Sequence, residues 1–466
     1  MTERLADLTA VELVSRYQEG SLSPVEVLED VLARVETLEP KLCALYALEP
    51  DRARAAARES EYRWRRGEAG PLDGVPVTVK ENIATRGTPV PQGTAATELI
   101  PAPEDAPAAA RLRAAGAVIF SKTTMPDYGM LSSGVSTFHH LSRNPWDLTR
   151  TPGGSSAGAG AAAAAGYGPI HIGTDIGGSI RLPAGWCGLV GVKPTHGRVA
   201  VGIPYPGRAI GPLTRTAADA ALALSIISGP DRRDYTSLPH DEALNPSHLA
   251  DLETPEGIRV GLLLDAGVGL PVDPEVTAAV SAAAALLEKA GAFVEPIGPI
   301  VTREMLDGLD RFWRVRSAYD ISNLPADRQT KVLPEIREWV STASDLTPFD
   351  VLHGHSQMHA LAVAVDAAFA DYDVILSPVA PITAFAAELA YPTDDPLKPF
   401  EHIAFTVPYN MSAHPATTVN CGFSTDGLPI GLQIAAPRFH DLAALRLAAY
   451  VDSVAPHRPW PLAAAG

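Results

Sequence analysis

This chain has few cysteines, and its sequence shows neither the pattern of a secretion signal nor a long apolar run. Its 466 residues include only three cysteines, Cys43, Cys187 and Cys421, which lie far apart. An odd number at such spacings gives no disulfide framework, so we expect the reducing cytoplasm. The first ten residues lack the apolar stretch of a signal peptide. No apolar run is long enough to span a bilayer, so we expect no membrane partner.

The chain also lacks an excess of positive charge. Lys and Arg total 37 against 54 Asp and Glu, which gives a formal net charge of −17 at pH 7. Such a surface repels polyanions, so we expect no nucleic-acid partner. The arginines of segment 50–66 alternate with Glu59 and Glu61. They therefore predict a solvated helix face rather than a nucleic-acid patch.

Helical and strand patterns alternate along the sequence. Thr9 with Glu12, and Ser23-Pro24 with Glu26, predict two capped helices near the N-terminus. The alanine- and glycine-rich stretch 157–167 predicts a tightly packed, buried helix. Short apolar runs predict strands at 75–79, 117–120, 169–173, 188–192, 259–264, 293–297 and 372–376.

This mixture predicts an α/β protein, a three-layer α/β/α sandwich around a mixed, twisted central sheet. No repeat and no long flexible linker interrupts the sequence, so a single domain over 1–466 is expected. Within it we expect N-terminal helices in 1–70, a core carrying the chemistry in 71–235, and a variable segment at 300–400 that lines a pocket. The last segment is rich in aromatic residues and has the weakest pattern.

Three segments carry the chemistry: PVTVKEN at 76–82, GGSSAG at 153–158 and DIGGSIR at 175–181. Lys80, Ser155 and Ser179 within them are the residue types of a serine hydrolase that uses lysine as its base. An unperturbed lysine has a pKa of about 10.4, so fewer than about one in a thousand is neutral at pH 7. A pKa of about 7 requires roughly 4–5 kcal/mol, which burial can supply. Lys80 follows an apolar strand, which is consistent with burial.

The glycines beside Ser179 indicate a close approach of backbone to substrate. The consecutive amides of Ile176, Gly177, Gly178 and Ser179 can point at one spot and form an oxyanion hole. Taken alone, a Gly-Gly-Ser turn more often binds a phosphate or only reverses the chain.

The sequence does not match the glycine motifs of nucleotide-binding proteins or of α/β-hydrolases. Segment 153–158 lacks the Lys-Ser/Thr ending of a Walker A motif, and no strand leads into it as in a dinucleotide-binding fingerprint. Arg181 stands where Gly-x-Ser-x-Gly has its second glycine. This argues against an α/β-hydrolase.

The stretch 152–196 resembles the signature of the amidase signature family almost from end to end. PGGSSAG at 152–158 precedes DIGGSIR at 175–181, and KPT follows at 193–195. The similarity continues in GLPIGLQ at 427–433 and covers nearly the whole chain, most weakly across 300–400.

This resemblance implies a role for each residue of the site. Ser179 is the nucleophile that forms an acyl-enzyme, and Ser155, after a cis peptide at Gly154, passes the proton of Ser179 to Lys80. No cofactor and no metal take part. Supporting positions are Ser156, Thr174, Asp175 and Arg181, and Tyr128, Gly129 and Met130 are expected at the substrate pocket.

Three other groups of residues could form sites. His353, His355 and His359 have a spacing that could hold a metal, but no carboxylate or cysteine completes the set, so a solvated or pocket-lining helix is favoured. His171 alternates with apolar neighbours and is expected to be a packed core histidine. Cys187 is expected to be a small buried residue.

The resemblance and the aromatic residues predict a hydrolase of small hydrophobic or aryl amides, with esters and carbamates also possible substrates of the same chemistry. The expected partner is a small-molecule amide, and the expected state is a monomer or homodimer. The alternative is the glutaminase component of a tRNA amidotransferase complex, although Ile403 stands where that component usually carries an acid. A non-catalytic protein of this fold is disfavoured because Lys80, Ser155 and Ser179 are all present.

Overall fold

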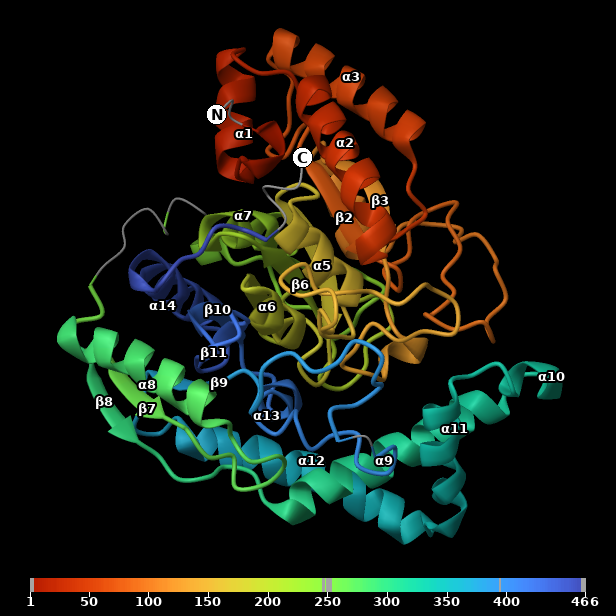
Figure 1. Ribbon diagram of the computed structural model, residues 1–466, viewed down its shortest axis with the longest axis vertical. Helices are drawn as coiled ribbons and strands as arrows, with labels where there is room; N and C mark the ends of the chain where they lie inside the picture. Colours follow the sequence, from red (N-terminus) through yellow and green to blue (C-terminus); the bar gives the residue numbers. More distant parts are fainter. Residues whose placement is uncertain (1–3, 245–247, 249–253, 394, 462–466) are drawn as a thin grey trace.

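The computed structural model describes residues 4–244, 248, 254–393 and 395–461. The strands of the described chain join in a single sheet (Figure 1). They are β1 (Leu45–Tyr46), β2 (Pro76–Lys80), β3 (Val118–Thr123), β4 (Ile170–Asp175), β5 (Val190–Lys193), β6 (Ala209–Thr214), β7 (Arg259–Leu262), β8 (Phe293–Pro296), β9 (Val374–Pro378), β10 (Ala416–Phe423) and β11 (Pro429–Ala435).

The sheet is mixed, and its order is β1-β3-β2-β4-β6-β5-β10-β11-β9-β7-β8. The strand β2 pairs in parallel with both β3 and β4, whereas β6 runs antiparallel to β4 and β5. The predicted strands all lie in this sheet, with ends that differ by at most three residues. The strands β1, β6, β10 and β11 were not predicted.

The helices of the described chain are α1 (Ala10–Glu19), α2 (Pro24–Leu42), α3 (Pro50–Arg66), α4 (Pro107–Ala114), α5 (Ala157–Ala165), α6 (Arg181–Cys187), α7 (Ala217–Ile227), α8 (Pro274–Lys289), α9 (Arg303–Ser322), α10 (Ala326–Gln329), α11 (Pro334–Ser341), α12 (Pro348–Ala368), α13 (Val407–Met411) and α14 (Asp441–Val454). The two predicted capping boxes, Thr9 with Glu12 and Ser23 with Glu26, are both formed.

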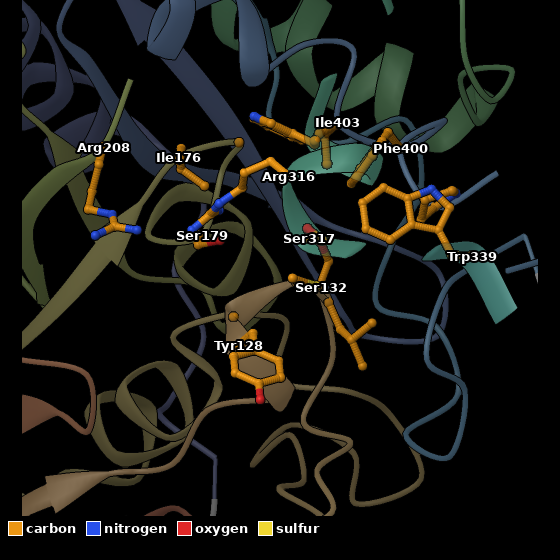
Figure 2. Close-up of a pocket in the computed structure, with 16 residues that line it drawn as sticks. Tyr128, Ser132, Ile176, Ser179, Arg208, Arg316, Ser317, Trp339, Phe400 and Ile403 are labelled. Carbon is orange, nitrogen blue, oxygen red and sulfur yellow. The ribbon is translucent and has the colours of Figure 1, made fainter. Parts of the chain in front are cut away.

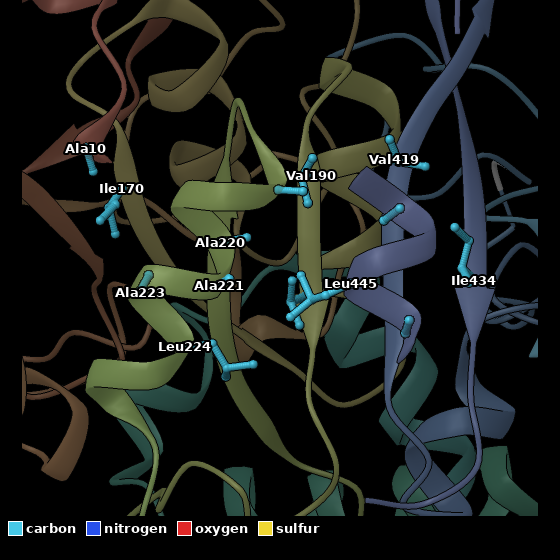
Figure 3. Close-up of a cluster of buried hydrophobic side chains, with 14 of the residues drawn as sticks. Ala10, Ile170, Val190, Ala220, Ala221, Ala223, Leu224, Val419, Ile434 and Leu445 are labelled. Atoms are coloured by element: carbon cyan, nitrogen blue, oxygen red, sulfur yellow. The ribbon is translucent and has the colours of Figure 1, made fainter. Parts of the chain in front are cut away.

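Helices cover both faces of the sheet. On one face α5 packs on β2, β4 and β6, while α6 packs on β5, β10 and β11. On the other face α7, α8 and α14 enclose the largest apolar cluster, and Figure 3 shows Leu224 and Leu445 on helices that lie in front of the strands carrying Val190 and Val419. The helices α9 and α12 pack on each other at the lower end of the molecule in Figure 1. The predicted three-layer α/β/α architecture is confirmed.

The helix α5 places the catalytic region through its small residues. Its nine residues are alanine or glycine, and all of them are buried. A Cβ atom at Gly158 would lie 2.1 Å from the Ala44 carbonyl oxygen and 2.5 Å from the Thr124 backbone nitrogen. Only glycine allows this approach of α5 to the backbone beside β3, so the start of α5 fixes Ser155 and Ser156 next to the end of β2.

We expect Gly158→Ala to destabilise the fold by about 1–3 kcal/mol, because the added methyl group meets backbone atoms that cannot turn away. Urea denaturation followed by circular dichroism measures this change. Gly298→Ala is the matched control, because no atom lies within 4 Å of its added Cβ. Equal stability of the two variants would contradict the close packing of α5.

Candidate active site

Lys80 ends β2 in the interior of the protein. Its side chain is 0% exposed, and its amine lies 2.8 Å from Ser155 Oγ, 3.1 Å from Ser156 Oγ and 3.0 Å from Thr174 Oγ1. The partners come from the segment before α5 and from β4, which neighbours β2 in the sheet. Strand pairing and helix packing thus bring the predicted lysine and its hydroxyl partners together.

Burial lowers the pKa of Lys80 to about 7, because the surrounding protein disfavours the charged amine. The carboxylates of Asp175 and Glu81 oppose this shift, and the charge of Arg208 reinforces it. A large fraction of Lys80 is therefore neutral near pH 7. A neutral amine 2.8 Å from the Ser155 hydroxyl can accept its proton.

Ser155 and Ser179 lie on two segments that meet at the backbone. The peptide bond between Gly154 and Ser155 is cis, as the family resemblance predicts. The Ser156 N–H donates to the Ser179 carbonyl oxygen at 3.1 Å. Within the described part of the chain no direct hydrogen bond joins the Ser155 and Ser179 hydroxyls. Such bonds often form only once substrate is bound.

The loop of Ser179 is held by one buried carboxylate. The Gly178 and Ile180 N–H groups donate to Asp175 at 2.9 and 3.0 Å. The amide of Gly178 is therefore already engaged, which corrects its predicted place in the oxyanion hole. The N–H groups of Ile176, Gly177 and Ser179 remain available as donors, since no turn or loop hydrogen bond of the described residues uses them.

Asp175 is itself fixed by Arg181. Their ion pair spans 2.9 Å, and both side chains are 0% exposed. Burial alone would raise the pKa of Asp175, but the charge and hydrogen bonds of Arg181 outweigh it and hold this pKa below its usual range. Arg181 also donates to the Thr406 carbonyl at 2.8 Å and to Gln433 Oε1 at 2.7 Å. The nucleophile loop is thereby tied to the start of α13 and to β11.

A cleft with a volume of about 680 Å³, including the space at its solvent-open entrance, leads to Ser179 (Figure 2). Tyr128, Gly129 and Met130, the residues expected at a substrate pocket, line this cleft. The cleft is also lined by Trp313 on α9, Trp339 on α11, Arg316 and Phe400, which belong to the segment 300–400 expected to line a pocket, and by Arg208 and Ile403. The Trp313 and Trp339 rings each contact Phe400 edge-on, with centroids 5.2 and 5.5 Å apart.

The other candidate residues lie elsewhere. His353 lies on α12 and pairs with Glu304 at 3.1 Å, and the rings of His355 and His359 are 4.9 Å apart. Among the described residues no group of three or more His, Cys, Asp and Glu side chains is placed to hold a metal. His171 is buried against Thr78 at 2.8 Å, as expected of a core histidine.

Cys187 is buried with its thiol 3.3 Å from the Pro152 carbonyl oxygen, and all three cysteines are free. Within the part of the chain that the structure describes, no helix combines the length and apolar character needed to cross a membrane.

Comparison with known proteins identifies the family. A model of the amidase family matches residues 26–445. The chain is 34% identical to the A subunit of the glutamyl-tRNA(Gln) amidotransferase of Symbiobacterium thermophilum, over 97% of each chain. The chain belongs to the amidase signature family, whose members hydrolyse amide C–N bonds, and both of these predictions are confirmed.

Solved structures give the same result. A bacterial aryl acylamidase of the amidase signature enzymes matches with a TM-score of 0.89 and 28% identity, covering 97% of this chain and 96% of that one. The A subunit of the glutamyl-tRNA(Gln) amidotransferase of Thermotoga maritima matches with a TM-score of 0.78 and 26% identity over 98% of both chains.

The expectation that a small amide is the sole partner, and that the protein works as a monomer or homodimer without nucleic acid, is wrong. The relative from Symbiobacterium thermophilum, and another from Anaeromyxobacter dehalogenans that is 36% identical, are each named as the A subunit of an enzyme named for glutamyl-tRNA(Gln). The absence of a nucleic-acid partner was inferred from the net charge, which sums the charges of the whole protein. The net charge therefore does not determine which partners a local surface patch can bind.

We expect Asp175→Asn to destabilise the protein by about 3–5 kcal/mol, because it leaves the buried Arg181 without its counter-charge. Urea denaturation gives the free energy of unfolding. Asp373→Asn is the matched control, since it breaks a pair with Arg259 that is 3.7 Å long and 53% exposed on both sides. That change should cost less than about 1 kcal/mol. A similar small cost for both would show that Asp175 does not anchor the loop.

Proposed function

We propose that this protein hydrolyses amides that carry an apolar or aryl group, through an acyl-enzyme on Ser179. The observation that carries the proposal is the buried amine of Lys80, which contacts three hydroxyls beside the loop of Ser179. Ser179 is 9% exposed and lines the cleft, so substrate can reach its hydroxyl.

In acylation, neutral Lys80 takes the proton of Ser155 while Ser155 takes the proton of Ser179. The Ser179 oxygen then attacks the carbonyl carbon, and the oxyanion receives hydrogen bonds from the free N–H groups of Ile176, Gly177 and Ser179. The relay reverses to protonate the leaving nitrogen as the C–N bond breaks. Water then cleaves the acyl-enzyme by the same path and restores the Ser179 hydroxyl.

The cleft supports an apolar or aryl substrate group. Trp313, Trp339 and Phe400 form an aromatic wall, and Met130 and Ile403 add aliphatic surface. The overall likeness to an aryl acylamidase points in the same direction. The relay acts on a carbonyl with a leaving group, so esters and carbamates that fit the cleft are also proposed substrates.

The second candidate is the glutamine-hydrolysing component of an amidotransferase. It is favoured by amidotransferase relatives that are 34 and 36% identical over more than nine-tenths of their length. Ile403 argues against it: it is 4% exposed and forms part of the apolar wall, where an ammonium group would find no counter-charge.

The hydrolysis rate should rise with pH through about 7, because Lys80 acts as a base only after it loses its proton. Lys80→Ala should lower kcat by about 10²–10⁴-fold or more and abolish this rise. The control is Lys289→Ala, an exposed lysine at the end of α8. A pH-independent rate, or near wild-type turnover by Lys80→Ala, would rule out the relay.

Two substrates separate the candidate functions. Release of 4-nitroaniline from 4-nitroacetanilide by the wild type, but not by Ser179→Ala, is the outcome expected for the main proposal. Ammonia release from glutamine, alone or with added partner subunits, with the anilide left intact would favour the amidotransferase. Equal rates for wild type and Ser179→Ala would reject Ser179 as nucleophile in either function.

A further inference from the structure

Two arginines line the cleft together with its aromatic residues. Arg208 comes just before β6, and Arg316 comes from the middle of α9. Both line the same cleft as Ser179, and Figure 2 shows both side chains extending toward Ser179 from opposite sides. The cleft therefore combines an apolar, aromatic lining with two cationic side chains.

The ring of Tyr205 connects the two arginines. The guanidinium carbon of Arg208 lies 5.3 Å from the ring centroid, and that of Arg316 lies 4.7 Å from it. Stacking on a ring fixes the plane of a guanidinium while leaving its N–H donors free at the edge. The Tyr205 side chain thus holds two like charges near each other, an arrangement that favours a negative charge between or beside them.

The two arginines differ in their own partners. Arg316 forms an ion pair with Asp320 at 2.9 Å. Arg208 is half-buried, and among the described residues its guanidinium has neither an ion pair nor a hydrogen bond. Burial lowers the pKa of Arg208, and the nearby charge of Arg316 lowers it further. A half-buried cation that keeps its donors free beside a nucleophile is costly unless a ligand supplies its counter-charge.

We infer that Arg208, supported by Arg316 and Tyr205, binds an anionic group of the substrate, such as a carboxylate, while the aromatic wall holds an apolar group. This inference rests on the proposed function of Ser179. The substrate is then an amide with two different ends, one apolar and one negatively charged. Arg208 becomes a residue that determines specificity without taking part in proton transfer.

Paired substrates test this preference. The 4-nitroanilides of malonic, succinic and glutaric acid each carry one free carboxylate, and the anilides of propionic, butyric and valeric acid replace it with a methyl group. We expect the best carboxylate substrate to exceed its neutral partner by about ten-fold or more in kcat/KM, as one charge-assisted contact allows.

The variants separate recognition from electrostatic effects on Lys80. Arg208→Gln should reduce the carboxylate-to-neutral ratio at least about ten-fold, whereas Arg208→Lys should keep part of it. The charge of Arg208 also lowers the pKa of Lys80, but this effect acts on both substrates and cancels in the ratio. Arg232→Gln, an exposed arginine outside the cleft, is the charge-matched control and should leave the ratio unchanged.

Binding and turnover fail in different ways. Calorimetry with Ser179→Ala and the succinic half-anilide measures binding without hydrolysis, and Ser179→Ala/Arg208→Gln should bind it about ten-fold more weakly. Turnover of neutral anilides at least as fast as of charged ones, with a ratio that Arg208→Gln does not change, would overturn the inference alone. Binding that depends on Arg208, without turnover of any anilide, would uphold the inference and overturn the proposed function.

Discussion

The burial of Lys80 is the constraint on which the rest of the site depends. An amine in the interior is stable only as the neutral form with hydrogen-bonding partners around it, and here Ser155, Ser156 and Thr174 provide them. The same burial that makes the lysine a base also requires that these hydroxyls stay in place. The tight approach of α5 to the sheet, which Gly158 allows, meets that requirement.

A second buried group complements the first. Lys80 is kept neutral by burial, whereas Asp175 at the end of β4 is kept charged by Arg181 at the start of α6. The neutral group moves protons, and the charged group shapes the backbone that carries Ser179. The protein interior thus holds a proton acceptor, Lys80, near a permanent anion, Asp175. The two groups differ in charge because hydroxyls surround Lys80, whereas a cation pairs with Asp175.

The sequence was sufficient for the parts of the site that local motifs determine. Lys80, Ser155 and Ser179 lie in short segments, and their meeting follows from the pairing of β2 with β4 and the packing of α5. The strand β6 was missed because Gly211 and Pro212, which are unusual in strands, lie in its middle. In β10 the register shifts between Asn420 and Gly422, which breaks the expected alternation.

Other features depend on the folded chain alone. No local pattern indicates that Arg208 and Arg316, which lie far apart in the sequence, meet across Tyr205. Likewise, the hydrogen bond from the Gly178 N–H to Asp175 depends on the turn that the loop adopts. A sequence of four consecutive amides does not show which of them already donate a hydrogen bond within the protein.

The two walls of the cleft come from different parts of the architecture. The wall formed by residues 128–132 together with Ile176, Gly177 and Ser179 lies beside the sheet and the proton relay. By contrast, Trp313, Arg316 and Trp339 come from α9 and α11, which lie outside the sheet. Substitutions on those helices can therefore reshape the preference for a substrate without disturbing Lys80 or its hydroxyl partners. Because of this separation, related proteins can change their substrate preference through substitutions in one wall of the cleft while the catalytic residues beside the other wall stay the same.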